Sequence, residues 1–192
     1  MDYELAVEGG PETIPGGTSV LLVHPSTAET DRIDTDFLKT DTDRFLVVST
    51  RTTAREVTQK LDYYDVDADA AEILDTLSVD RGYSRRTRDD VHYVSAPDDL
   101  DGIVAKTEEF LAENDGKLRI SVDSITEIAY YAGETPAREA VERLLALLGE
   151  HDAVGLFHLS DEVHDEDVLD SYRELFDLVI TLDPDGGIAV DE

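Results

Sequence analysis

The chain has 192 residues, a length that suits one domain with a sizeable core and makes two full domains unexpected. Its 46 acidic and 16 basic side chains give a formal net charge of −30. That balance excludes general nucleic-acid binding and argues against binding to an anionic membrane surface, because the chain has few cations to neutralise phosphates. Since 41% of the residues are hydrophobic, the chain still has enough apolar material for a folded core.

The excess of carboxylates indicates the cytosol of an extreme halophile. A surface coated with acids repels itself in dilute salt, whereas at about 1 M salt the Debye length of roughly 3 Å screens most of that repulsion. An unusually acidic mesophilic protein is the alternative. The chain has no Cys, its longest apolar runs are about five residues, and its first residues lack the basic start of a signal peptide. We therefore expect a soluble, cytoplasmic protein without disulfides and without a membrane span.

Short apolar runs rich in β-branched residues mark the strand candidates. The runs are continuous rather than alternating, which is typical of strands buried on both faces of a parallel sheet. The predicted strands are residues 19–23, 45–49, 73–77, 91–95, 118–123, 154–159 and 178–182. Residues 11–17 predict a loop before the first of them. The segment DPDGG (183–187) predicts a turn, so a short last strand at 188–190 should complete a C-terminal β-hairpin.

Helical patterns lie between these strands. The predicted helices are residues 53–61, 98–113, 136–148 and 165–176, and a further helix begins near Ile125. Thr53 can cap the first of them, and Pro136 stands at a permitted first-turn position of a helix that ends before Gly149. Because strands and helices alternate, the sequence predicts a single α/β domain over residues 1–192, with a mostly parallel central sheet flanked by helices.

Several motifs follow one another in a recognisable order. A Gly-Gly pair at 16–17 precedes SVLLV (19–23), FLVVST (45–50) and TAREV (53–57), and AVGLFHL (153–159) comes late. The most specific motifs are VHYVSAPDDL (91–100) and VDSITEI (122–128). In this order the chain resembles the KaiC-like branch of the RecA-type ATPases, particularly its small haloarchaeal members, over about residues 16–190. The resemblance implies a RecA-like, P-loop-type core, ATP binding at a P-loop, and often a role in signalling or regulation.

The segment that corresponds to the P-loop lacks most of what a phosphate cradle needs. The motif GxxxxGK(S/T) uses glycines so that backbone amides wrap the phosphate oxygens, and its Lys neutralises the β/γ charge. Residues 24–30 read HPSTAET, so both glycines are missing, the segment is one residue short, and Glu29 stands at the Lys position. Only Thr30 matches the motif, as the hydroxyl that binds the metal ion.

The magnitudes favour loss of nucleotide binding. Two unit charges ~4 Å apart interact by about 4 kcal/mol at an effective dielectric constant near 20, so Glu in place of Lys turns an attraction into a comparable repulsion. Micromolar affinity corresponds to only about 8 kcal/mol in total. A Mg²⁺ ion that bridges Glu29 and a phosphate is the one rescue, and we do not expect it.

The remaining ATPase landmarks are two carboxylates. In the family, one acid follows the second core strand and activates the attacking water, but residues 49–52 read STRT and contain no acid. Asp123 matches the Walker B aspartate, an outer-sphere ligand of Mg²⁺, at the end of a hydrophobic strand. The alternative, which we favour, is that Asp123 caps the helix that begins near Ile125, with Ser124 assisting. Thr30 and Asp123 are thus at most vestigial nucleotide-binding residues.

Two histidines lie close together in the sequence among acids. His158 and His164, with Asp161, Glu162 and Asp165, have the residue types of a divalent-metal site. However, His158 falls in a predicted strand, and the acids suit a solvated loop that caps a helix. We therefore predict no metal and no other cofactor.

The segment RGYSRRTRDD (81–90) is the one basic cluster and predicts an exposed loop. Arg81, Arg85, Arg86 and Arg88 are the candidates for contact with an acidic partner or a phosphate, although pairing with neighbouring carboxylates is the plainer alternative. The tyrosine pairs at 63–64 and 130–131 should each have one packed ring and one nearer the surface, where aromatic rings often serve interfaces.

Taken together, these patterns predict a catalytically inactive RecA/KaiC-like module, a pseudo-ATPase. It would regulate or scaffold through a protein partner or self-association, without nucleic acid or membrane. The alternative is a nucleotide-binding switch that uses Thr30 and Asp123 without hydrolysis. The melting temperature with ATP and Mg²⁺ distinguishes these two hypotheses. A ligand at a hundredfold excess over its Kd stabilises the folded state by about 2.7 kcal/mol.

Overall fold

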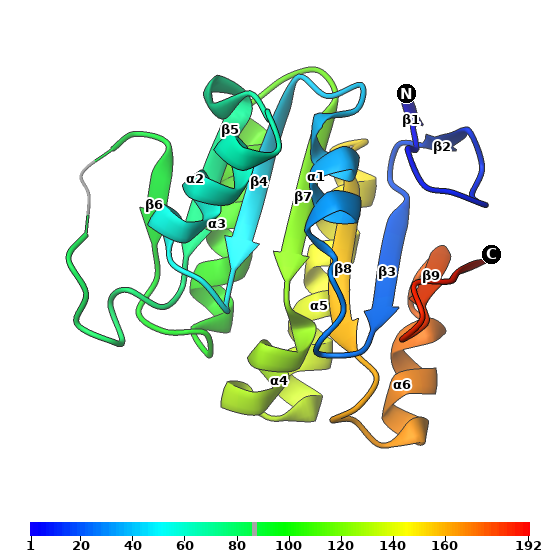
Figure 1. Cartoon of the computed structure of the whole chain (residues 1–192). Coiled ribbons are helices and arrows are strands. Elements are labelled where there is room, and N and C mark those ends of the chain that lie inside the picture. Colours follow the sequence, from blue (N-terminus) through cyan, green and yellow to red (C-terminus); the bar gives the residue numbers. More distant parts are fainter. Residues whose placement is uncertain (86–87) are drawn as a thin grey trace.

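The computed structural model describes residues 1–85 and 88–192, and its centre is a sheet with the strand order β10-β9-β3-β8-β7-β4-β5-β6 (Figure 1). Neighbouring strands are parallel except for the terminal pair β9 and β10, which is antiparallel. The strands are β3 (Ser19–His24), β4 (Arg44–Ser49), β5 (Ala71–Asp75), β6 (Val91–Tyr93), β7 (Leu118–Asp123), β8 (Val154–Ser160), β9 (Leu178–Leu182) and β10 (Ile188–Asp191). The parallel sheet and the C-terminal hairpin confirm the sequence prediction.

Helices cover both faces of the sheet. One face carries α1 (Asp31–Lys39) and α2 (Ala54–Tyr63), joined to β5 through the short 3₁₀ helix η1 (Ala68–Ala70). The other face carries α3 (Leu100–Glu113), α4 (Ile125–Ala132), α5 (Glu134–Glu150) and α6 (Glu166–Arg173). Because side chains alternate along a strand, Val20 and Leu22 of β3 belong to the first core, and Leu21 and Val23 belong to the second. This explains why the strands of the sequence are apolar without interruption.

Local capping sets where α2 and α3 begin. Thr53 starts α2 with a full capping box, in which its backbone N–H donates to Glu56 at 2.8 Å. Asp99 accepts from the N–H of Gly102 at the start of α3. Gly133, with φ of +92°, turns the chain from α4 into α5, a backbone conformation that favours glycine. The helix α5 begins at Glu134, two residues before the Pro136 start that the sequence predicts.

The N-terminal residues differ from the sequence prediction. Residues 11–17 were expected to be a loop, but β2 (Thr13–Pro15) pairs antiparallel with β1 (Asp2–Glu4). This strand pair depends on contacts with residues far along the chain. Tyr3 is fully buried, its hydroxyl donates to the carbonyl of Asp152 at 2.8 Å, and it accepts from the N–H of Leu118 at 3.2 Å. The strand predicted at 73–77 also lies two residues earlier, because Asp75 accepts from the N–H groups of Leu77 and Ser78 and ends β5 in a turn.

Candidate functional site

The carboxyl ends of β3, β4 and β7 border a cavity of about 510 Å³ between α1 and α2. In the sheet, β8 and β7 separate β3 from β4, so the chain that leaves β3 must cross over them. Open α/β sheets bind ligands at such a point, outside the carboxyl ends of the strands. The cavity brings together the two residues that the sequence proposed for a nucleotide, Thr30 and Asp123, and Glu29 lies beside them.

The connection between β3 and α1 is tight. The N–H of Ala28 donates to the carbonyl of Pro25 at 3.0 Å and closes a turn. The N–H of Ser26 donates to the carboxylate of Glu162 at 3.1 Å, and the hydroxyls of Ser26 and Ser160 share a hydrogen bond of 2.9 Å. Two amides of the segment that would wrap a phosphate are therefore committed within the protein. Thr30 precedes α1 and is buried, and its side chain makes no cap hydrogen bond.

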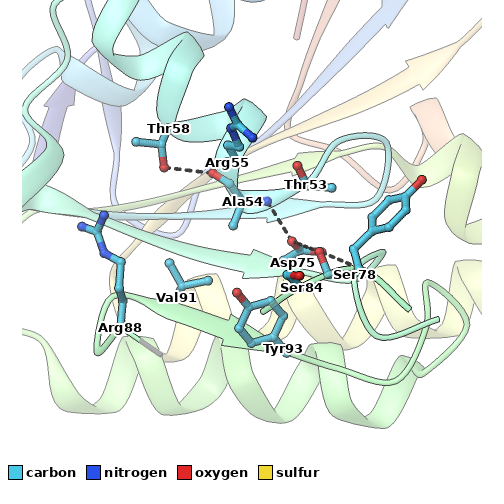
Figure 2. A pocket seen from close by; sticks show the side chains of 11 residues that line it. Thr53, Ala54, Arg55, Thr58, Asp75, Ser78, Ser84, Arg88, Val91 and Tyr93 are labelled. Atoms are coloured by element: carbon cyan, nitrogen blue, oxygen red, sulfur yellow. Dashed lines mark hydrogen bonds between the residues drawn. The ribbon is translucent and has the colours of Figure 1, made fainter. Parts of the chain in front are cut away.

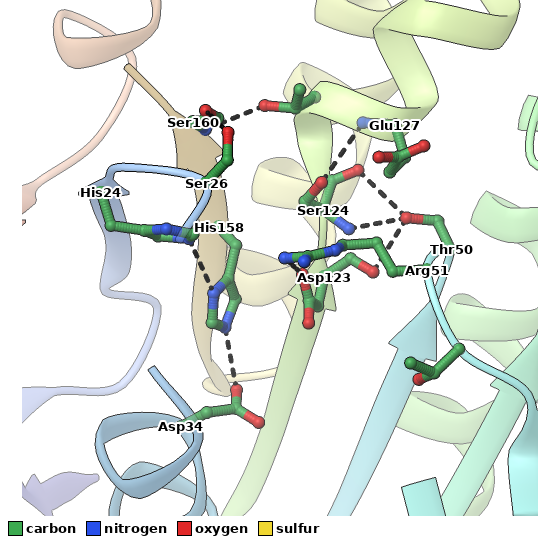
Figure 3. Close-up of polar contacts among 12 residues, drawn as sticks. His24, Ser26, Asp34, Thr50, Arg51, Asp123, Ser124, Glu127, His158 and Ser160 are labelled. Carbon is green, nitrogen blue, oxygen red and sulfur yellow. Dashed lines mark hydrogen bonds and ion pairs between the residues drawn. The ribbon is translucent and has the colours of Figure 1, made fainter. Parts of the chain in front are cut away.

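A chain of buried polar groups lies beside the cavity (Figure 3). The carboxylate of Asp34, on α1, accepts from Lys60 Nζ at 2.8 Å, from the hydroxyl of Ser121, and from His158 Nε2 at 3.0 Å. Nδ1 of His158 lies 3.3 Å from Nε2 of His24, whose Nδ1 is 2.9 Å from the carbonyl of Pro25. The network thus joins β3, α1, α2, β7 and β8 through side chains.

The hydrogen bonds of this network determine its proton count. Nδ1 of His24 must carry a proton, because the carbonyl of Pro25 only accepts, and Nε2 of His158 must carry another toward the Asp34 carboxylate. The bond between the rings needs a third proton. Three protons on two imidazoles amount to one positive charge, which is buried beside Asp34.

The pKa directions place that charge on His158. Burial lowers the pKa of His24, which keeps this ring neutral. Burial also acts to lower the pKa of His158, but the negative charge of Asp123 and the hydrogen bond to Asp34 outweigh it and raise this pKa. For Asp34, burial acts to raise the pKa, and the charges of Lys60 and His158 hold it well below its usual range. These directions favour the imidazolium form of His158, and the Asp34 carboxylate lies between this ring and the ammonium group of Lys60.

Both cations of the cavity are engaged with carboxylates. Lys60, which reaches in from α2, is bound to Asp34, and Arg51 Nη1 lies 3.5 Å from Asp123 Oδ1. Four carboxylates also line the cavity, so the formal charge of the lining is −2; they are Glu29, Asp31, Glu56 and Asp123. A polyphosphate would meet net repulsion here unless Lys60 or Arg51 left its partner.

The ends of β4 and β7 are tied together through Thr50. Its hydroxyl donates to the carbonyl of Asp123 at 2.8 Å and accepts from the N–H of Ser124 at 2.7 Å. Ser124, not Asp123, caps α4, because its hydroxyl accepts from the N–H of Glu127. The expectation that Asp123 is the cap is therefore wrong, and its carboxylate instead lines the cavity against Arg51 (Figure 3).

His158 and His164 do not meet. Nδ1 of His164 lies 2.6 Å from Glu134 and its Nε2 lies 3.0 Å from the hydroxyl of Thr126, whereas His158 is part of the buried network. Over residues 1–85 and 88–192, no group of three or more His, Cys, Asp or Glu side chains is arranged to hold a metal ion.

The arginine segment is exposed where the structure describes it. Arg81, Arg85 and Arg88 are exposed, and Arg86 lies outside the described residues. The prediction of one packed and one exposed ring is confirmed for the tyrosine pair 63–64 and is wrong for the pair 130–131, in which both rings are exposed. Tyr63 is 80% exposed and Tyr130 82%, whereas Tyr64 packs against the core and Tyr131 is 37% exposed.

Sequence reasoning missed Asp34 and Lys60. The available signal was an acid on the inner side of a short amphipathic helix, DRIDTDFLK, where Phe37 and Leu38 are also buried. An acid in that position needs a compensating cation, but nothing in the sequence says which one it is.

Solved structures share this fold. An ATPase from the type III secretion system of pathogenic bacteria superposes with a TM-score of 0.67 at 12% identity, over 96% of this chain and 57% of its own. The chain thus spans little more than half of that ATPase. A KaiC-like protein from the hyperthermophilic archaeon Pyrococcus horikoshii superposes with a TM-score of 0.66 at 14% identity, over 99% of this chain and 85% of its own. These likenesses confirm the predicted RecA-like architecture and, at such identities, show the fold alone.

A third structure is an uncharacterised Pyrococcus horikoshii protein in complex with an unknown peptide. It superposes with a TM-score of 0.67 at 16% identity, over 92% of this chain and 83% of its own. A search of curated proteins finds no match. Within the described part of the chain, no helix is long and apolar enough to cross a bilayer. One family model matches the whole chain, residues 1–192, and the protein accordingly belongs to the family of unknown function DUF7090.

Proposed function

We propose that this protein is a non-hydrolysing RecA/KaiC-like module that regulates or scaffolds by binding protein, in the cytosol of a halophile. The observation that carries the proposal is the cavity at the carboxyl ends of β3, β4 and β7. Its lining has a formal charge of −2, and each of its two cations already faces a carboxylate. A site that bound and cleaved ATP would need the opposite balance.

The residues that ATP hydrolysis requires are also missing, both in the segment that corresponds to the P-loop and at the position of the catalytic acid. Residues 24–30 contain neither Gly nor Lys, and the amides of Ser26 and Ala28 donate within the protein. Residues 49–52 contain no acid to orient a water, and the hydroxyl of Thr50 is bonded to β7. If Lys60 turned to a phosphate, Asp34 would lose its closest cation. Such a loss costs several kcal/mol, a large part of a micromolar binding energy of about 8 kcal/mol.

Binding of protein has separate support. Large apolar side chains are exposed at Tyr63, Tyr130 and Val163, and tyrosines are enriched in interfaces. Arg81 and Arg85 are exposed in a chain with an excess of acids and suit an acidic partner. The uncharacterised Pyrococcus horikoshii protein that shares this fold was solved in complex with an unknown peptide, which supports peptide binding by this chain.

The test is an ATPase assay together with thermal unfolding in molar KCl, with ATP and Mg²⁺. We expect no hydrolysis above buffer and no change of Tm. A ligand at a hundredfold excess over its Kd would stabilise the fold by about 2.7 kcal/mol and would be visible. Hydrolysis that Asp123→Ala abolishes, but the control Asp36→Ala on the neighbouring helix retains, would overturn the proposal. Activity that both variants retain indicates a contaminating ATPase.

The second candidate is a nucleotide-binding switch without hydrolysis. It is favoured by one observation, that the cavity of about 510 Å³ holds Thr30 and Asp123 together with Lys60 and Arg51. A rise of Tm with ATP and Mg²⁺ that Thr30→Val and Asp123→Ala each remove, with no phosphate release, would establish this candidate in place of the first.

A further inference from the structure

The buried carboxylate of Asp75, beside the start of α2, is fully engaged in holding the fold (Figure 2). It is 1% exposed and accepts from the N–H groups of Ala54, Leu77 and Ser78 at 2.8–2.9 Å and from the hydroxyl of Ser78 at 2.7 Å. Because a carboxylate has about four acceptor positions, Asp75 has none left for a ligand. A group of three side chains beside α4 is different, because it lines a cavity and its hydrogen bonds run in one direction.

This group is a hydroxyl, an imidazole and a carboxylate in series. The hydroxyl of Thr126 lies 3.0 Å from Nε2 of His164, and Nδ1 of the same ring lies 2.6 Å from Oε1 of Glu134. An ionised carboxylate only accepts, so Nδ1 of the neutral ring carries the proton and Nε2 accepts from the Thr126 hydroxyl. This order of groups, at these distances, is the arrangement that activates a hydroxyl as a nucleophile.

The fold fixes each member of the series. Thr126 is in the first turn of α4, Glu134 begins α5, and His164 lies between β8 and α6. The N–H of Ser160 donates to the hydroxyl oxygen of Thr126 at 2.9 Å, which leaves the hydroxyl proton for His164. The ring of Tyr172 packs edge-on against His164, with the centroids 6.2 Å apart, and the His164 side chain is 2% exposed. The imidazole is therefore held in one orientation.

All three side chains line one cavity of about 310 Å³, whose other lining residues are Glu127, Ala129, Tyr130 and Val163. The whole lining lies in the described part of the chain, and none of it also lines the first cavity. The volume is at the lower end of the range of about 300–1,000 Å³ that is typical of small-molecule sites. Tyr130 and Val163 are 82% and 64% exposed and make the cavity partly apolar, whereas its two glutamates repel anions. The cavity thus suits a small, uncharged molecule with an apolar part.

The start of α4 favours the negative charge that a nucleophilic attack creates. The N–H of Thr126 has no acceptor among residues 1–85 and 88–192, as is usual in the first turn of a helix. The positive end of the helix dipole also lies at this turn. Amide donors and dipoles of this kind stabilise the oxyanion of a tetrahedral intermediate.

We propose that this site hydrolyses small uncharged esters, with Thr126 as the nucleophile, His164 as the general base and Glu134 as a positioning residue. Oγ1 of Thr126 attacks the carbonyl carbon while its proton passes to Nε2 of His164. The tetrahedral intermediate expels the alcohol, which takes this proton, and the acyl group stays on Thr126. Water then attacks the acyl carbon and gives a proton to Nε2. That proton returns to Oγ1 as the carboxylic acid leaves. The reaction needs no nucleotide, so it goes beyond the proposed function.

The test combines hydrolysis of 4-nitrophenyl acetate by the full chain in molar KCl with labelling by a fluorophosphonate, which reacts with activated hydroxyls. We expect turnover and a mass increase on the peptide that contains Thr126. Thr126→Val and His164→Gln should each lower the rate at least about hundredfold and remove the label, because the nucleophile or its base is lost. Thr126→Ser should retain both. His151→Gln changes a histidine outside the cavity, at the end of α5, and should affect neither.

Glu134→Gln tests the positioning role. The substrate should still bind, so KM should change little, whereas kcat should fall at least about tenfold because the carboxylate no longer fixes the tautomer of His164. The proposal is overturned if the wild type turns over no faster than His164→Gln, if folded Thr126→Val protein keeps the rate, if the label falls on another residue, or if Glu134→Gln leaves kcat unchanged. Should Thr126→Val not fold, the label on the wild type and the rate of Thr126→Ser decide.

Discussion

Replacement of Asp34 by Asn should strongly destabilise the protein, because it removes a buried carboxylate that pairs with the largely buried Lys60 and with His158. The side chain is 1% exposed and lies 2.8 Å from Lys60 Nζ and 3.0 Å from His158 Nε2. Asn has nearly the same shape, so the change isolates the charge from the packing. Removal of one partner from a buried ion pair costs about 3–5 kcal/mol, a large share of a total stability of about 5–15 kcal/mol.

The assay is unfolding by denaturant and by heat at one fixed KCl concentration. For a chain of this size, a loss of about 3–5 kcal/mol lowers Tm by roughly 6–20 °C. Asp36→Asn is the matched control on the same helix. Asp36 pairs with Lys39 at 2.8 Å, but the two side chains are 28% and 40% exposed, so the control should lose at most about 1 kcal/mol.

A double variant separates charge from other effects. Lys60→Met alone leaves Asp34 short of a cation, whereas Asp34→Asn with Lys60→Met removes a negative and a positive charge together. The double variant should therefore lose less stability than the two single losses combined. The reasoning is refuted if Asp34→Asn lowers the free energy of unfolding no more than Asp36→Asn does. It is also refuted if the losses of the two single variants simply add in the double variant, because the charges then do not interact as the geometry indicates.

Three further outcomes follow from the charges. The pKa of His158 is raised on folding, because the Asp123 charge and the Asp34 hydrogen bond outweigh burial. Its stabilisation is therefore complete below the unfolded pKa of about 6.5 and is lost as pH rises through the higher folded pKa. In urea unfolding, His158→Gln should lose the decline of stability that the wild type shows as pH rises above about 6.5, and an unchanged slope contradicts the assignment. The net charge of −30 predicts that the unfolding midpoint rises between low and molar KCl, and a flat or falling midpoint would remove the halophile interpretation. Glu29→Lys should not create ATP hydrolysis in a phosphate-release assay, because residues 24–30 still lack Gly and residues 49–52 lack an acid; measurable turnover would show that one charge was the missing part.

The fold class could be predicted from the sequence because local patterns encode it. Continuous apolar runs such as residues 19–23 and 45–49 can satisfy burial on both faces only in a covered parallel sheet. The DPDGG segment determined the C-terminal hairpin through turn chemistry, and β9 and β10 pair as expected. The order of the motifs indicated a RecA-like core, which the structural neighbours share.

The site depended on contacts that no local pattern encodes. Lys60 meets Asp34 across 26 residues, and His24 meets His158 across 134. Sequence alone places His24 directly after one predicted strand and His158 within another, and it did not predict the helix α1 that carries Asp34. In so charged a chain, each of these residues has many carboxylates and cations available as partners. The β1–β2 pair likewise exists because Tyr3 is buried against Asp152 and Leu118, far along the chain. Periodicity determines whether a residue is buried. Which charge compensates a buried charge is decided through space, by the strand order that brings β3, β7 and β8 together.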